Sequence, residues 1–109
     1  MGTFSIFKST ANNEYRYRLI ANNNKIILSG EGYKSLQSCK DGIQSVKINS
    51  QYDFRYEKSD KPGNYRFNLK ASNGQVIGVS EGYTTAYARD EGIADVKRIA
   101  PTATIIDLS

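Results

Sequence analysis

The sequence predicts an α+β fold made of two tandem βββα repeats plus a C-terminal strand. One pattern occurs twice at a fixed offset, alternation of period two marks strands, and a later change to helical spacing marks one helix in each copy. We expect an antiparallel sheet packed by two helices, with pseudo-two-fold symmetry. The chain of 109 residues is long enough for a single domain, residues 1–109.

The repeat is clearest in EGYKSLQSCKDGIQSVKINS, residues 31–50, which returns as EGYTTAYARDEGIADVKRIA, residues 81–100. An ungapped alignment of the first repeat, 4–50, with the second repeat, 54–100, gives 16 identities in 47 positions. Such similarity indicates duplication of one supersecondary unit. A half of about 50 residues buries too little apolar surface to be stable alone, so we expect the two halves to share a core.

Each repeat opens with three predicted strands. Residues 4–8 are rich in β-forming residues, and in residues 15–20 the apolar and basic side chains alternate. The apolar face holds Tyr15, Tyr17 and Leu19, and the opposite face holds Arg16 and Arg18. The third strands, residues 25–29 and 75–80, follow polar turns in which Asn and Gly tolerate the positive φ of a tight hairpin.

A helix is predicted after the third strand of each repeat. Leu36, Cys39, Ile43 and Val46 recur at helical spacing and form one apolar stripe. The second copy keeps Ala86, Ile93 and Val96 on this stripe but has Arg89 in place of Cys39. Ser35 and Thr85 are the expected N-caps. Residues 104–108, after Pro101, form the predicted C-terminal strand.

Two motifs recur at one spacing. Tyr-Arg-x-x-Leu-x-Ala occurs at residues 15–21 and 65–71, and Glu-Gly-Tyr is followed in each repeat by a helix glycine. The residues of the second motif are Glu31, Gly32, Tyr33 and Gly42, and Glu81, Gly82, Tyr83 and Gly92. This motif set resembles the YegP-like family of small bacterial proteins over nearly the whole chain. The resemblance implies a compact α+β fold with internal pseudo-symmetry, but no activity, substrate, cofactor or catalytic residue.

We interpret the repeated Glu-Gly-Tyr motif as structural, because a scaffold needs it in both halves. Gly32 can turn the corner between strand and helix, and Tyr33 can fold onto the base of the helix. Gly42 and Gly92 each lie inside a helix, where they allow close approach of helix to sheet. A loop that presents a carboxylate and a phenol to a ligand remains the alternative.

The composition argues against most catalytic chemistry. The chain has one cysteine and no histidine, which leaves too few ligands for zinc and no side chain suited to proton transfer near neutral pH. A single thiol builds no disulfide framework, which favours a cytoplasmic location. No apolar run is long enough to span a membrane. We therefore predict no catalytic residue, no metal, no cofactor and no membrane partner.

Two sets of residues leave an enzymatic function as an alternative. Cys39 could act as a nucleophile, but it lies on the apolar stripe and lacks a histidine base, so a buried thiol is favoured. Asp90, Glu91 and Asp95 lie close together on the second helix and could act as acid and base. A solvated helix face explains them equally well.

The net charge of +4 lies entirely in the first half. Residues 1–50 hold seven Lys and Arg against three Asp and Glu, whereas residues 51–109 hold eight of each. The candidate contacts for an anion or nucleic acid are Arg16, Arg18, Lys25 and Arg66. Because alternation places the strand arginines opposite the aromatic residues, a shared stacking platform is disfavoured.

The sequence favours a non-enzymatic binding or interaction module that works through its surface. Weak, salt-dependent nucleic-acid binding by the basic first repeat is the first alternative, and an unidentified enzyme is the second. An exposed strand edge could also support a homo-oligomer. The sequence identifies no partner.

Overall fold

The structure, a computed structural model, describes residues 2–109, so Met1, the first residue of the predicted domain, lies outside the described part. The elements follow the order β1-β2-β3-α1-η1-β4-β5-β6-α2-η2-β7. The strands are β1 (Thr3–Lys8), β2 (Tyr15–Ile20), β3 (Ile26–Ser29), β4 (Tyr56–Lys61), β5 (Asn64–Lys70), β6 (Val76–Val79) and β7 (Thr104–Asp107). The helices are α1 (Leu36–Asn49), α2 (Ala86–Ile99) and the 3-10 turns η1 (Asp53–Arg55) and η2 (Ala100–Thr102). The predicted α+β class is confirmed.

The seven strands found in residues 2–109 form one mixed sheet in the order β4-β5-β6-β3-β2-β1-β7. The prediction of an antiparallel sheet is wrong at one edge, where β7 pairs parallel with β1. The chain reaches this edge through α2 and η2, which follow β6, so β7 pairs with a strand far from it in the sequence. The two halves meet at β3 and β6, whose ladder contains the single pair Ser29 and Val79.

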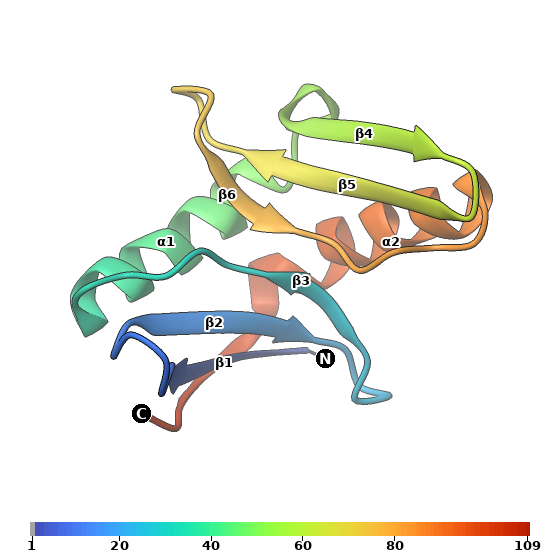
Figure 1. The fold of residues 1–109 in the computed structure, drawn as a ribbon. Helices are drawn as coiled ribbons and strands as arrows, with labels where there is room; N and C mark the ends of the chain where they lie inside the picture. The colour runs from blue at the N-terminus through green and yellow to red at the C-terminus, as the bar shows by residue number, and fades with distance from the viewer. Residues whose placement is uncertain (1) are drawn as a thin grey trace.

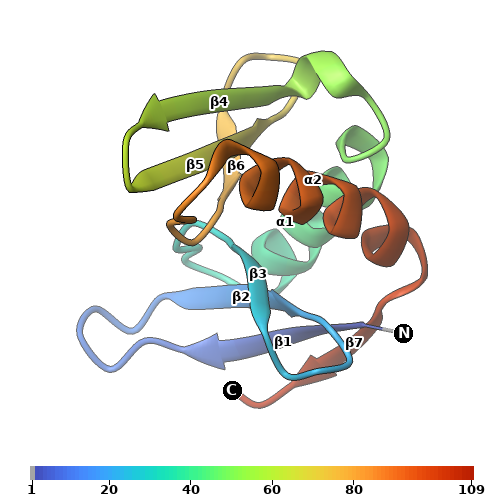
Figure 2. The same ribbon diagram turned by 90° about the vertical axis from the view of Figure 1, so that its right-hand side faces the viewer.

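The sheet bends around the two helices. Figure 2 shows α1 and α2 in the middle, with β4 and β5 on one side and β1, β2 and β7 on the other. Each helix touches strands from both halves: α1 contacts β2, β5 and β6, and α2 contacts β3 and β5. β3 and β6 lie side by side where the halves meet (Figure 1). The helices therefore bridge a junction that strand pairing alone would hold weakly.

The helices form where the apolar stripes predicted them. Ser35 caps α1 by accepting a hydrogen bond from the Ser38 amide, and Thr85 caps α2 by accepting one from the Ala88 amide. Along α1, Cys39, together with Ile43 and Val46 one and two turns later, is buried in the core. Among residues 2–109 no helix is long and apolar enough to cross a membrane.

The two hairpins between the second and third strands of each half have the same turn. Asn24 and Gly74 both have positive φ, 64° and 84°, and their amides donate to the carbonyls of Ala21 and Ala71. Asn24 therefore adopts the same left-handed conformation as Gly74, because asparagine tolerates this region better than most residues.

The first strand of the second half departs from the predicted register. β1 pairs Phe4 with Leu19, whereas β4 pairs Tyr56 with Leu69, the residue 50 positions after Leu19. Tyr56, not Phe54, therefore occupies the place of Phe4. Tyr56 also meets Phe67 edge-to-face at 5.6 Å, as Phe4 meets its neighbour Tyr17 at 5.9 Å.

The cause of this shift is the length of the connecting loops. Six residues, 9–14, join Lys8 to Tyr15, whereas four residues, 61–64, join the equivalent pair Asp60 and Tyr65. The second hairpin closes through the tight turn Pro62-Gly63, with Gly63 at φ 77°. In an ungapped alignment of the two halves, their first strands are therefore offset by two residues.

Candidate functional site

The register shift leaves two aromatic side chains exposed on the connection between α1 and β4. Phe54, at 74% exposure, and Tyr52, at 47%, lie with ring centroids 5.5 Å apart. The Arg55 guanidinium carbon lies 4.7 Å from the centre of the Phe54 ring. We call Tyr52, Phe54 and Arg55 the aromatic surface. Ile48, one turn before Tyr52 and 63% exposed, adds apolar area beside them in the sequence.

The aromatic surface is held in place by polar contacts on either side. Asp53 forms an ion pair with Lys97 of α2, and the Lys97 ammonium lies 5.9 Å from the Tyr56 ring. The Tyr56 hydroxyl donates to the Ser50 carbonyl at 2.8 Å. The turn η1 is therefore tied to α1 and α2, while its aromatic rings face outward.

Arg55 adds an unusual feature. Its Nε is buried and has no hydrogen-bond partner among residues 2–109. Because buried polar groups are normally paired, a group at this position has an interaction still to make. A carboxylate beside Arg55 could supply that interaction with the charge-assisted geometry that guanidinium favours.

The four basic residues predicted to contact an anion do not share one surface. Arg16 and Arg18 pair with Phe7 and Ser5 of β1, on the sheet face away from the helices. Arg18 lies over the Phe7 ring at 4.4 Å. Phe7 therefore lies on the same face as the two arginines, which the sequence analysis did not predict.

Lys25 and Arg66 lie elsewhere. Lys25 is on the side of the helices, with its ammonium 5.2 Å from the Tyr83 ring. Arg66 is on β5 in the other half and donates to Asn64 at 3.1 Å. The structure thus brings Arg16 and Arg18 together and leaves the other two apart.

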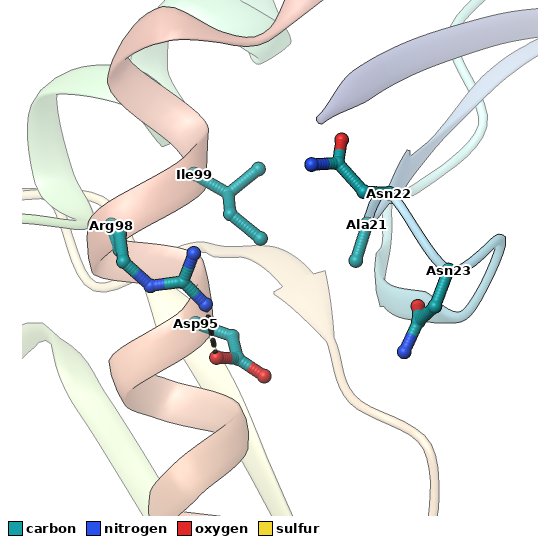
Figure 3. A pocket seen from close by; sticks show the side chains of 6 residues that line it. All are labelled: Ala21, Asn22, Asn23, Asp95, Arg98 and Ile99. Carbon is teal, nitrogen blue, oxygen red and sulfur yellow. Dashed lines mark hydrogen bonds and ion pairs between the residues drawn. The ribbon is translucent and has the colours of Figure 1, made fainter. Parts of the chain in front are cut away.

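A pocket of about 260 Å³ separates the β2–β3 turn from the C-terminal part of α2 (Figure 3). It is lined by Ala21, Asn22, Asn23, Asp95, Arg98 and Ile99. Arg98 donates to Asp95 at 2.7 Å, and the Asn22 side chain lies across the pocket from them. Arg98 is 69% exposed, so this ion pair is well solvated.

A second pocket, of about 270 Å³, follows α2 toward its N-terminus and shares Asp95 with the first. Tyr83 of the Glu-Gly-Tyr motif lines it. Burial raises the pKa of Tyr83, and the nearby Asp95 and Glu81 carboxylates raise it further. Its hydroxyl therefore stays protonated at neutral pH.

The glycines of the repeated motif make room for its tyrosines. A Cβ on Gly42 would collide with the Tyr33 hydroxyl, and a Cβ on Gly92 would collide with that of Tyr83. Each tyrosine also pairs its backbone with the second strand, Tyr33 with Tyr15 and Tyr83 with Tyr65.

The outer parts of the motif differ between the halves. Gly32 leaves room for the Glu14 carboxylate and Gly82 for the Asn64 amide. Glu31 and Glu81 are both exposed.

Two of the side chains considered for catalysis, Cys39 and Asp90, are buried or already paired. Cys39 is fully buried, and burial raises the pKa of its thiol to about 11, with a smaller contribution from Asp107. Asp90 is engaged by Arg89 and by Lys58, at 3.0 and 3.2 Å. Within residues 2–109 no group of His, Cys, Asp and Glu side chains could hold a metal ion.

Sequence reasoning missed the aromatic surface because it aligned Phe54 with the core residue Phe4. The signal that could have found it is the shorter Pro62-Gly63 turn, which requires a two-residue shift. For Tyr83 the sequence analysis favoured a structural part over ligand binding, and the pocket and the ring contact with Lys25 distinguish Tyr83 from Tyr33.

Comparison with known proteins assigns the chain to a family. The sequence model of the family DUF1508, described as a domain of unknown function, matches residues 11–57 and 60–107. The chain belongs to this family. The first match spans β2, β3, α1 and η1 and reaches into β4, the second runs from the end of β4 through β5, β6, α2 and η2 to β7, and β1 lies outside both.

Solved structures and curated proteins agree with the assignment. The solution structure of YegP from Escherichia coli, a protein of unknown function, is 44% identical with a TM-score of 0.90, and the match covers 98% of this chain and 92% of that one. A UPF0339 protein encoded in the 5′ region of the ptx operon of Stutzerimonas stutzeri is 49% identical over 57 residues, 52% of this chain and 50% of the relative. The chain thus matches about half the length of that curated relative. The YegP-like assignment is confirmed, and the names of these relatives state no activity.

A shorter relative matches over most of its length. The UPF0339 protein of Treponema denticola is 43% identical over 49 residues, which are 45% of this chain and 83% of the relative. Since 49 residues are 83% of it, the relative is about 59 residues long, which is enough for one unit of the DUF1508 match.

Proposed function

We propose that this DUF1508 protein is a non-enzymatic binding module that engages another protein through the aromatic surface. The observation that carries the proposal is the pair of exposed aromatic rings, Tyr52 and Phe54, which contact each other at η1. The fold has no use for Phe54, since Tyr56 fills the corresponding place in the core. Exposed apolar clusters with polar surroundings are typical of interaction sites.

The energetics suit an interface hot spot. A fully covered aromatic side chain buries about 150–250 Å² of surface, at roughly 25 cal/mol per Å². Covering the exposed part of the Phe54 ring therefore contributes on the order of 3 kcal/mol before the entropic cost of association. Tyr and Arg, which flank Phe54 here, are among the residues most enriched in hot spots.

The expected partner segment is acidic and apolar. Arg55 supplies a cation whose Nε lacks a hydrogen-bond partner, so a carboxylate of the partner can bind there. An aliphatic or aromatic side chain beside that carboxylate can cover Tyr52 and Phe54. Asp53 is already paired with Lys97 and leaves Arg55 as the uncompensated charge of the turn.

Peptide display tests this function. Peptides selected on the wild-type protein and counter-selected on the Tyr52→Ala/Phe54→Ala double variant should be enriched in Asp or Glu next to an apolar residue. The wild type should bind them at least tenfold more tightly than the double variant, by fluorescence anisotropy. Arg55→Gln should weaken binding and remove most of its salt dependence.

A matched control separates this surface from general stickiness. Leu108→Ala removes an apolar side chain of similar exposure, 68%, at the other end of the molecule and should leave peptide binding unchanged. Both variants should melt within a few degrees of the wild type, because neither removes a core residue. Peptides that bind wild type and double variant equally would refute the proposal.

Nucleic-acid binding remains the second candidate, on the observation that Arg18 lies over the Phe7 ring next to Arg16. Phe7 and the two arginines could stack one base and hold its phosphates. Labelled single-stranded oligonucleotides at two salt concentrations decide this. Binding at low salt that Arg16→Ala/Arg18→Ala abolishes would support it, and no binding at low salt would exclude it.

We infer further that the halves are diverged copies of one βββα unit related by approximate two-fold symmetry. Equivalent contacts support this: Lys47 lies over Phe4 as Lys97 lies over Tyr56, both at 5.9 Å.

We also propose that residues 1–109 act as one domain in the bacterial cytoplasm, because its single thiol, Cys39, is buried and needs no oxidising compartment. A selective protease that released either half intact would contradict the single domain.

Self-association is proposed through β7 rather than β4. The β4 edge carries the charged sequence YEKSDK, which protects an edge against pairing. On the β7 edge Ile106 is 45% exposed, and the strand is followed by an exposed Leu108.

A further inference from the structure

The pocket beside Tyr83 is distinct from the aromatic surface and contains an unexplained polar group. We call it the Tyr83 groove. It is lined by Lys25, Tyr83, Tyr87, Ala88, Glu91, Gly92 and Asp95. The β2–β3 turn of the first half forms one wall and α2 of the second half forms the other, so the groove exists only where the halves meet.

The Tyr83 hydroxyl is the unexplained group. The residue is 7% exposed, and its hydroxyl is buried without a hydrogen-bond partner among residues 2–109. It lies against Gly92, which lines the same pocket. Leaving a buried hydroxyl unpaired is unfavourable, and natural proteins rarely keep one without a purpose. Tyr33, the equivalent residue in the first half, lines none of the four pockets described within residues 2–109.

Charges of both signs line the groove, two carboxylates and one ammonium. Glu91 and Asp95 lie one turn apart on α2, and Lys25 faces them from the turn with its ammonium over the Tyr83 ring. Arg98, one turn beyond Asp95, supplies a second cation in the adjoining pocket (Figure 3). A simple anion would meet two carboxylates and a simple cation would meet Lys25 and Arg98. Neither is favoured.

We propose that the Tyr83 groove binds a small zwitterion with the ammonium and carboxylate groups of a free α-amino acid. The ligand ammonium lies between Glu91 and Asp95, and its carboxylate is held by Lys25 and by a hydrogen bond from the Tyr83 hydroxyl. Tyr87 and Ala88 border the space left for the side chain. A volume of about 270 Å³ is at the small end of ligand pockets, as suits so small a ligand.

The test uses amino acids and analogues that lack one charge. The full-length protein labelled with nitrogen-15 is titrated with L-leucine, with 3-methylbutylamine, which lacks the carboxylate, and with 4-methylpentanoate, which lacks the ammonium. Glycine and L-glutamine replace leucine to vary the side chain. A saturable shift of the Lys25, Tyr83 and Gly92 amide signals is expected with the amino acids at millimolar concentration. Shifts of equal affinity with either analogue, or no saturable shift with any amino acid, would overturn the proposal.

Two matched variants locate the site. Tyr83→Phe removes the hydroxyl and should weaken binding about fivefold, as loss of one hydrogen bond predicts. Tyr33→Phe makes the same change in the other half and should leave affinity unchanged. Without ligand, Tyr83→Phe should melt at the same temperature as the wild type or higher, because it removes an unpaired polar group. A lower melting temperature, or equal loss of affinity in both variants, would show that the hydroxyl has a structural partner instead.

Discussion

At the scale of single residues, Arg89 shows what the apolar stripe could and could not predict. Its position inward on α2, in place of Cys39, follows from helical spacing, and it is 4% exposed. What holds it there is not local. Arg89 forms ion pairs with Asp60 and Asp90 and donates to the Ser59 carbonyl at 3.1 Å. Asp60 and Ser59 lie on β4, 29 and 30 positions earlier in the chain, so their place beside Arg89 depends on the strand register, which no spacing along α2 contains.

The pKa of Asp90 reports this network. Burial acts to raise it, but hydrogen bonds from Arg89 and Lys58 outweigh burial and lower the pKa below its ordinary value of 3.8. A carboxyl whose pKa is lowered by folding stabilises the protein above the unfolded pKa. That stabilisation is lost as the pH falls below about 3.8 and through the lowered value.

We expect Arg89→Met to destabilise the fold by about 1 kcal/mol and Arg89→Ala by about 3 kcal/mol. Met keeps most of the volume, and Asp60 and Asp90 can return to water, so no buried charge is stranded. Chemical denaturation measures both values, and the NMR titration of Asp90 should move up toward 3.8 in Arg89→Met.

The control for Arg89 is Arg98→Met. Arg98 is 69% exposed and paired with Asp95 one turn away, so its loss should change stability by less than about 0.5 kcal/mol. If Arg89→Met were as harmless as Arg98→Met, the buried network would contribute nothing.

At the scale of elements, the helices were predictable and the strand register was not. The caps at Ser35 and Thr85 and the buried stripe are local signals, and the structure has both. The strand from Tyr56 to Lys61 was placed two residues too early, because identity at Phe54 and Phe4 outweighed the loop length in an ungapped alignment. The parallel pairing of β7 was also out of reach, because it depends on where α2 returns the chain.

The β7 edge leads to a prediction about self-association. We expect a weak dimer through this edge, visible in sedimentation velocity at high protein concentration, that Ile106→Lys abolishes. A lysine on an edge strand opposes pairing by charge, and it also removes the exposed apolar side chain. Glu57→Lys on the opposite edge, β4, is the control and should not change the sedimentation coefficient. A concentration-independent monomer would contradict dimerisation through β7.

At the scale of the whole molecule, the halves fit together because they differ. Leu28 of β3 packs against Gly78 of β6, where a Cβ would lie 2.7 Å from a Leu28 methyl carbon. In the first half, Gly30 leaves room for the Tyr17 ring, whose hydroxyl donates to the Ile77 carbonyl across the junction. Two identical copies of the first half would set Leu28 against Leu28 with no glycine to receive either side chain.

This asymmetry decides how separated halves should behave. Residues 1–50 alone lose the strands that α1 covers in the other half, β5 and β6, and also the β7 partner of β1. Their core side chains, with Ile43 and Val46 among them, would face water, and about 50 residues cannot compensate. A homodimer could restore some contacts, as a relative of about 59 residues suggests, but the Leu28 conflict works against it.

We therefore expect residues 1–50 to show no cooperative melting by circular dichroism, and residues 51–109 to behave likewise. Mixed in equal amounts, the two fragments should recover the spectrum of the intact chain and melt in one transition, because each supplies the surface that the other lacks. The intact protein sets the reference, and sedimentation shows whether the mixture is a one-to-one complex. A monomeric 1–50 fragment with its own sharp melting transition would mean that a half can bury its apolar face unaided. The matched pairs of contacts across β3 and β6 would then need an origin other than mutual burial.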